Sequence, residues 1–167
     1  HDWNSLRQEW SVSVPEGAAT AEITGAGRLP ALTDVYNAST GFRLEPKSTE
    51  ALRSLRYNAG TGYPAFYAVD GQTAAGDVKI RIHPTADEDY TLDVYGFRKT
   101  ADLVSDDDVI AVPSKPVVYM AYALAARERG EVGGQTAAEI FGVANQYLRD
   151  AVAHDAALNN LDYNWYS

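Results

Sequence analysis

The chain has 167 residues, which suits one domain with a sizeable hydrophobic core, and its 46% hydrophobic and 22% charged residues exclude wholesale disorder. Its formal net charge of -9 argues against tight binding to nucleic-acid phosphates, because such binding depends on lysine and arginine. The sequence contains no cysteine, which excludes disulfides, thiolate nucleophiles and cysteine-ligated metals.

The N-terminal segment has helical spacing. Trp3, Leu6 and Trp10 recur at positions i, i+3 and i+7, which predicts a short helix with both indoles on one buried stripe. The sequence begins at His1 without a methionine although this pattern is already present. We therefore expect an N-terminal portion of the protein to be missing from it.

Residues 11–98 are predicted to be rich in β-strands. Segment 10–14 alternates apolar and polar residues and, with the turn after it, predicts a hairpin into the next strand. A short helix near residues 48–58 interrupts the strands, with Ser48 or Thr49 as its N-cap. The last three strands are expected to form an antiparallel meander. The predicted strands are 19–24, 32–37, 41–45, 64–69, 78–83 and 90–97.

Two helices and an aromatic tail are predicted at the C-terminal end. Apolar residues at helical spacing indicate antiparallel helices over 116–129 and 136–158, and the first is so apolar that it should be central. The tail, 159–167, follows the second helix. No apolar run approaches the roughly 18 to 20 residues of a membrane span, so no membrane contact is expected.

Together these elements predict an α+β fold. Its helical frame consists of the N-terminal helix and the two antiparallel C-terminal helices, with an antiparallel β-sheet or small β-sandwich in the middle. We expect a single domain over residues 1–167. Within it, the β-rich region covers about 11–98, the helix pair 114–158 and the aromatic tail 159–167.

The chain shows no pattern typical of a catalytic, metal or cofactor site. His1, His83 and His154 lack metal-ligand spacing, and no phosphate-binding or nucleophile motif is present. The carboxylates at 87–89 and 106–108 are more typical of an exposed turn and a solvated loop than of an acid–base pair or a calcium site. We therefore expect no catalytic residues, no metal and no cofactor.

Aromatic residues are abundant, with eleven tyrosines and three tryptophans. Tyrosine and tryptophan are enriched at protein interfaces, where they act as anchors. Several tyrosines fall at helical core spacing, but two lie near a glycine loop, and the tail adds a terminal apolar cluster. The predicted interface residues are Tyr57, Tyr63, Leu161, Tyr163, Trp165 and Tyr166.

Three segments occur in an informative order. Residues 64–71 read Pro-Ala-Phe-Tyr-Ala-Val-Asp-Gly, residues 78–84 read Val-Lys-Ile-Arg-Ile-His-Pro, and residues 89–95 read Asp-Tyr-Thr-Leu-Asp-Val-Tyr. This order resembles the head-to-tail adaptor proteins of tailed bacteriophages, as does the upstream segment Asp-Trp-Asn-Ser-Leu-Arg at 2–7. The chain departs from the family pattern in an insertion at 73–77 and in its aromatic tail.

The resemblance implies a structural virion protein without catalytic residues. It implies a homo-oligomeric ring, commonly of twelve copies, that binds the portal, meets tail, nozzle or stopper proteins, and continues the DNA channel. Double-stranded DNA would pass through during packaging and ejection without specific binding, which agrees with the acidic balance of the chain.

By the same likeness, the C-terminal helices form the channel-side ring and the β-region projects outward or toward the tail. The aromatic segment from Leu161 to Ser167 is expected to dock on the portal or on a neighbouring subunit. The protein is then expected in the neck of the virion, after assembly in the host cytoplasm.

Two other classes of function stay open from the residues themselves. A β-rich carbohydrate- or receptor-binding module of a phage tail would use the exposed tyrosines as its ligand platform, although the apolar helix pair fits it poorly. A carboxylate-dependent hydrolase would use Asp87, Asp89 or the aspartates at 106–108.

Overall fold

The structure is a computed structural model that describes residues 1–26, 30–55, 57, 60–100, 102–129 and 137–159. The chain divides into two compact units, which are described separately. The strand unit is Leu6–Thr100, and the helical unit combines His1–Ser5 with Ala101–Ser167.

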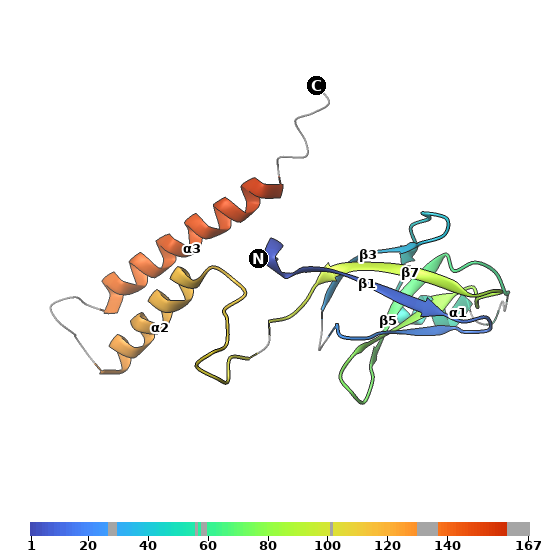
Figure 1. The fold of residues 1–167 in the computed structure, drawn as a ribbon, viewed down its shortest axis with the longest axis horizontal. Helices are drawn as coiled ribbons and strands as arrows, with labels where there is room; N and C mark the ends of the chain where they lie inside the picture. Colours follow the sequence, from blue (N-terminus) through green and yellow to red (C-terminus); the bar gives the residue numbers. More distant parts are fainter. Residues whose placement is uncertain (27–29, 56, 58–59, 101, 130–136, 160–167) are drawn as a thin grey trace, which may run out of the picture. The chain divides into compact units, whose positions relative to one another are not determined.

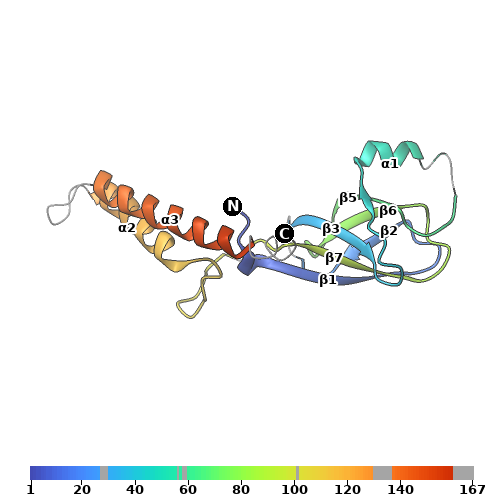
Figure 2. The ribbon, with the colours of Figure 1, turned by 90° about the horizontal axis from the view of Figure 1, so that it is seen from above.

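Two sheets make up the strand unit (Figure 1). Its elements are β1 (Arg7–Val14), β2 (Thr20–Ile23), β3 (Ala31–Asn37), β4 (Glu45–Pro46), α1 (Thr49–Leu55), β5 (Phe66–Gln72), β6 (Val78–His83) and β7 (Tyr90–Phe97). In the three-stranded sheet, β7 lies between β1 and β3 and runs antiparallel to both. The four-stranded sheet has the order β2-β6-β5-β4, in which only β4 and β5 are parallel. Helix α1 packs beside β5 and β6 (Figure 2).

Alternating side chains from both sheets fill one hydrophobic core. Along β1, Trp10, Val12 and Val14 are buried while the residues between them are exposed, and β6 shows the same alternation. This period of two places one face of each strand inside. Leu92 and Val94 of β7 join the same buried cluster as the inner side chains of β6. Because both sheets contribute to one cluster, the strand unit is a small β-sandwich.

The two ends of the strand unit lie on paired strands. β1 pairs with β7 along its whole length, beginning with Arg7 opposite Phe97. Just beyond that pair, the Arg98 N–H donates a hydrogen bond of 2.9 Å to the Leu6 carbonyl. The chain therefore enters and leaves this unit at neighbouring points.

The helical unit contains the helices α2 (Ser114–Arg129) and α3 (Ala137–Asn159). They lie side by side and run antiparallel (Figures 1 and 2). In the part of the chain that the structure describes, no helix combines the length and apolarity that a membrane crossing needs.

The contact between α2 and α3 has a small buried core that includes two alanines. Buried Ala123, Ala126 and Ile140 make up its core. Alanine lets helix backbones approach closely, but it also limits how much apolar surface the contact can bury. Towards the other end of the pair, the rings of Tyr119 and Tyr147 are 4.7 Å apart.

The predicted fold is wrong in its helical frame. Only Asn4–Leu6 form a helical turn, of the 3-10 type, and the following residues form β1. Trp10 is buried in the sandwich core instead of sharing a helix stripe with Trp3. The helical spacing overlapped with the period of two in 10–14, and pairing with the distant β7 favours the strand. The fold is α+β, with strands in the N-terminal and middle parts and helices in the C-terminal half.

Two predicted strand pairings are also wrong. β1 and β2 do not form a hairpin, because they belong to different sheets. The predicted meander is broken as well, since β5 and β6 pair in one sheet and β7 lies in the other. The strand predicted at 41–45 is reduced to Glu45–Pro46, with an isolated bridge at Arg43. The predicted bounds 78–83 and 90–97 are confirmed as β6 and β7.

Candidate interaction surfaces

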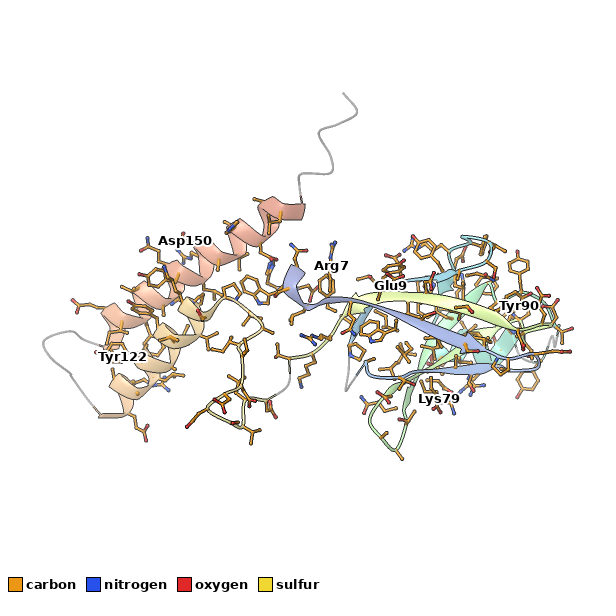
Figure 3. The ribbon with its side chains drawn as sticks, viewed as in Figure 1. Arg7, Glu9, Lys79, Tyr90, Tyr122 and Asp150 are labelled. Atoms are coloured by element: carbon orange, nitrogen blue, oxygen red, sulfur yellow. The ribbon has the colours of Figure 1, made fainter. Side chains whose placement is uncertain are left out.

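One side of α2 is apolar and exposed to solvent. Val118 is 56% exposed and Tyr122, labelled in Figure 3, is 44% exposed. This surface, named here the α2 outer face, comprises Val117, Val118, Ala121, Tyr122, Leu124 and Ala125. The sequence predicts a central helix, but a single chain leaves most of its apolar side chains uncovered. Contiguous exposed apolar residues are typical of an interaction site.

A cation lies near each end of α2. The Lys115 Nζ is 5.9 Å from the ring centre of Tyr147, and the Arg127 guanidinium carbon is 5.9 Å from that of Phe141. Among the described residues, neither cation has a carboxylate within ion-pair distance. Aromatic rings of α3 therefore lie beside a positive charge near each end of α2.

The loop before α2 is ordered by an aspartate. The Asp108 carboxylate accepts hydrogen bonds from the backbone N–H groups of Val104, at 2.6 Å, and Ser105, at 2.8 Å. These bonds, with that of Ser105 the stronger influence, hold the pKa of Asp108 below its ordinary value because they stabilise the ionised carboxylate. Val104 is 91% exposed and Val109 is 86% exposed. The 102–110 loop therefore presents apolar side chains on an ordered turn.

The N-terminal residues are fastened to α3 beside a small pocket. The backbone N–H of Asn4 donates to the Asp155 carboxylate at 3.2 Å, and its side-chain amide donates to the Asp155 carbonyl at 2.9 Å. The His1 Nε2 lies 2.8 Å from the same carboxylate. The adjacent pocket, about 340 Å³ in volume, is lined by Ser5, Ala111, Pro113, Ala151, His154, Asp155 and Leu158.

A groove of about 540 Å³ runs over the outer face of the three-stranded sheet. The rings of Tyr36 and Tyr95 meet edge to face with their centres 5.9 Å apart. The Tyr95 hydroxyl donates to the Glu9 carboxylate at 2.9 Å, and this bond raises the pKa of Tyr95 because ionisation would break it. Arg7 and Glu9 both lie on β1 (Figure 3), with the Arg7 guanidinium 5.7 Å from the Phe97 ring centre. The groove thus combines aromatic rings with charged groups.

The structure places only two of the predicted interface residues. Tyr57 is 92% exposed, and Tyr63 is 51% exposed with its ring 5.6 Å from that of Phe42. Both belong to the strand unit. The four tail residues lie outside the described part of the chain: Leu161, Tyr163, Trp165 and Tyr166.

Two of the carboxylates at 87–89 accept hydrogen bonds from other residues of the strand unit. Asp87 accepts a hydrogen bond from the Tyr90 hydroxyl at 2.7 Å, which holds the pKa of Tyr90 above its ordinary value. Asp89 accepts from the backbone N–H of Glu16 at 2.8 Å. Across the described ranges, no three histidine, aspartate or glutamate side chains cluster in a way that could hold a metal ion.

Sequence reasoning did not find the groove or the exposed valines. Strand alternation places Tyr95 on the outer face. Glu9 and Tyr36 lie beside it because β1 and β3 both pair with β7, and no local sequence pattern predicts these long-range pairings. The exposure of Val104 and Val109 could not be predicted from the sequence either, because aliphatic residues are usually buried in a folded chain.

Comparison with known proteins gives one match that covers nearly the whole chain. A family model described as SU10 adaptor protein matches residues 2–162. A search of curated proteins finds no match.

Proposed function

Because the chain belongs to the SU10 adaptor protein family of phage head-to-tail adaptors, we propose that it forms an oligomeric ring joining the portal to the tail. Membership makes it a structural phage protein, of a non-enzymatic kind, in the neck of the virion, where adaptors interact with portal and tail proteins. The proposed ring has twelve copies and continues the channel through which double-stranded DNA passes.

The α2 outer face is the observation that best supports a ring. A monomer in water would keep this apolar strip hydrated, and burying it between copies contributes about 25 cal/mol for each Å² of apolar surface. In a ring every copy has two neighbours, so the same strip is covered in all copies. The α2 and α3 pair is therefore the proposed ring-forming part of the chain.

The distribution of charge supports a DNA channel on the helical side. The helical unit carries 11 acidic and 4 basic residues, a formal charge of -7, whereas the strand unit carries 12 and 10, a charge of -2. A wall of negative charge repels the phosphates and lets DNA slide without binding it. We place the helices beside the channel and the strand unit toward the outside or the tail.

The aromatic residues predicted as interface anchors are proposed to contact the portal, a neighbouring copy or the tail proteins. Leu161, Tyr163, Trp165 and Tyr166 are proposed to dock on the portal or on a neighbouring copy. Tyr57, with its ring exposed, is proposed to contact a tail, nozzle or stopper protein together with Tyr63. Truncation after Leu161 tests the tail anchor, because loss of portal binding is expected, while unchanged binding and virion assembly would contradict it.

The test of the ring uses the full chain and its purified portal. Mass measurement of the mixture is expected to show a complex with about twelve added copies, and cryo-electron microscopy of the particle should show them below the portal. A chain that stays monomeric and never joins the portal would overturn the proposal.

A carbohydrate- or receptor-binding role of the strand unit is the second candidate. The groove with Tyr36 and Tyr95 favours it, since aromatic rings beside charged side chains suit a polar ligand. Binding of a host-surface saccharide by the free chain, lost in Tyr95→Ala and independent of the portal, would support this role over the ring.

A further inference from the structure

Two valines of the 102–110 loop are left uncovered by the described residues. With 91% and 86% of their surfaces exposed, Val104 and Val109 make almost no contact with the described residues. The Asp108 hydrogen bonds hold the turn that carries them, so little order must be gained on binding. A hydrogen-bonded loop with two exposed aliphatic side chains is typical of a segment that inserts into a protein interface.

The α2 outer face offers matching chemistry. Its exposed surface is aliphatic and aromatic, and Lys115 and Arg127 lie near its two ends without a carboxylate partner among the described residues. The loop carries Asp106 and Asp107, both exposed, between its valines. If the loop valines packed on the α2 outer face, the loop aspartates could pair with a cation at its end. The contact would then bury apolar surface and form an ion pair at once.

We infer that the 102–110 loop of one copy docks on the α2 outer face of the next copy, an inference that rests on the proposed ring. The loop and the helix face are different surfaces of one helical unit. A contact between two different surfaces is heterologous, and its repetition generates a closed ring when the rotation closes. The inference assigns the loop to the subunit interface and not to the portal or the tail.

The absence of cysteine allows a direct test by cross-linking. Copies carrying Val104→Cys are mixed with copies carrying Val118→Cys, assembled on the portal and treated with a short bis-maleimide. We expect the mixed ring to give at least about tenfold more cross-linked pairs than either variant alone, since only neighbouring copies bring the two thiols together.

The matched control replaces Val118→Cys by Val143→Cys, an apolar position on α3 that is 41% exposed. Equal cross-linking through Val143 would overturn the inference, and so would cross-linking of the loop to the portal. If the unmodified chain forms a ring but the mixed variants give no cross-link, the inference fails and the ring stands. If the unmodified chain forms no ring, the proposed function fails with it.

A second variant removes the apolar contact without a cross-linker. Val104→Asp with Val109→Asp is expected to raise the concentration for half-maximal ring formation by about tenfold or more. Its circular dichroism and melting temperature should not change, because both side chains are exposed in the free chain. Unchanged ring formation would overturn the inference.

Discussion

The strand unit and the helical unit differ in how completely they bury their own apolar residues. The ten largest fully buried side chains of the described residues, Ile80 and Leu92 among them, all belong to the strand unit. Among the described large apolar residues that stay exposed, ten lie in the helical unit and five in the strand unit. The difference shows that the strand unit buries its largest apolar side chains within itself, whereas the helical unit leaves apolar surface uncovered by the described residues, which is typical of an interaction site.

The largest effect is expected from a cavity in the sandwich core. Leu92→Ala on β7 removes a fully buried side chain and should lower the free energy of unfolding by about 2–5 kcal/mol. Ile140→Ala in the helical unit should lower it by less, about 2 kcal/mol, because its buried cluster is small and its other buried members are Ala123 and Ala126. Hydrogen exchange resolved by unit measures both, and a larger loss for Ile140→Ala would contradict the comparison.

Charges placed on the α2 outer face should act on assembly and not on folding. Val118→Asp with Tyr122→Asp is expected to weaken ring formation on the portal at least tenfold, about 1.4 kcal/mol, since two aspartates would have to be desolvated. The melting temperature of the free chain should stay the same. Val69→Asp, at a position of the strand unit that is 50% exposed, serves as the control and should assemble normally.

The ion pair of Asp70 and Arg81 should contribute more than the exposed pairs of the strand unit. Arg81 donates from Nε and Nη2 to one oxygen of Asp70, at 3.2 and 2.6 Å, and both side chains are largely buried. Asp70→Asn should lower the free energy of unfolding by about 1–3 kcal/mol in urea titrations. Glu45→Gln, which breaks the exposed pair with Lys47, should change it by about 0.5 kcal/mol or less.

The smallest expected effect is that of low pH on the order of the 102–110 loop. The pKa of Asp108 is lower in the folded chain than in the unfolded chain, so its contribution is present above the unfolded value and is lost as pH falls through the folded value. Amide exchange at Val104 and Ser105, measured relative to its intrinsic rate at each pH, should therefore quicken only below the ordinary pKa range of an aspartate. Asp108→Asn should quicken it at neutral pH, and exchange that is unchanged in this variant would show that the carboxylate does not order the turn.

Period-two patterns were sufficient to locate most strands in the sequence, but not to assign them to sheets. β6 and β7 alternate over their whole length, and their predicted bounds are correct. The first part of β1 is predicted as helix because Trp10 belongs to both a helical and an alternating pattern. Its partner β7 is far away in the sequence, and such pairing is decided by the shared core of the whole unit.

The candidate surfaces, like the strands, are predicted only in part from the sequence. Tyr57 and Tyr63 are predicted to be exposed, and their exposure is confirmed, although their role as anchors stays a prediction. The apolar spacing of the C-terminal helices is visible in the sequence, but it cannot tell a helix buried within one chain from a helix buried between chains. Which element or chain covers the helix depends on the tertiary fold. For this reason the sequence predicts α2 to be central, although one chain leaves its outer face exposed.

The hydrogen-bonded ends of the strand unit make it an insertion that can be exchanged. The chain leaves the helical unit after Ser5 and returns near Ala101, and the strands it passes through begin and end opposite each other at Arg7 and Phe97. Any graft whose first and last strands are neighbours could span the same two junctions. An engineered tag or replacement module placed at these junctions should therefore leave α2 and α3 unaltered.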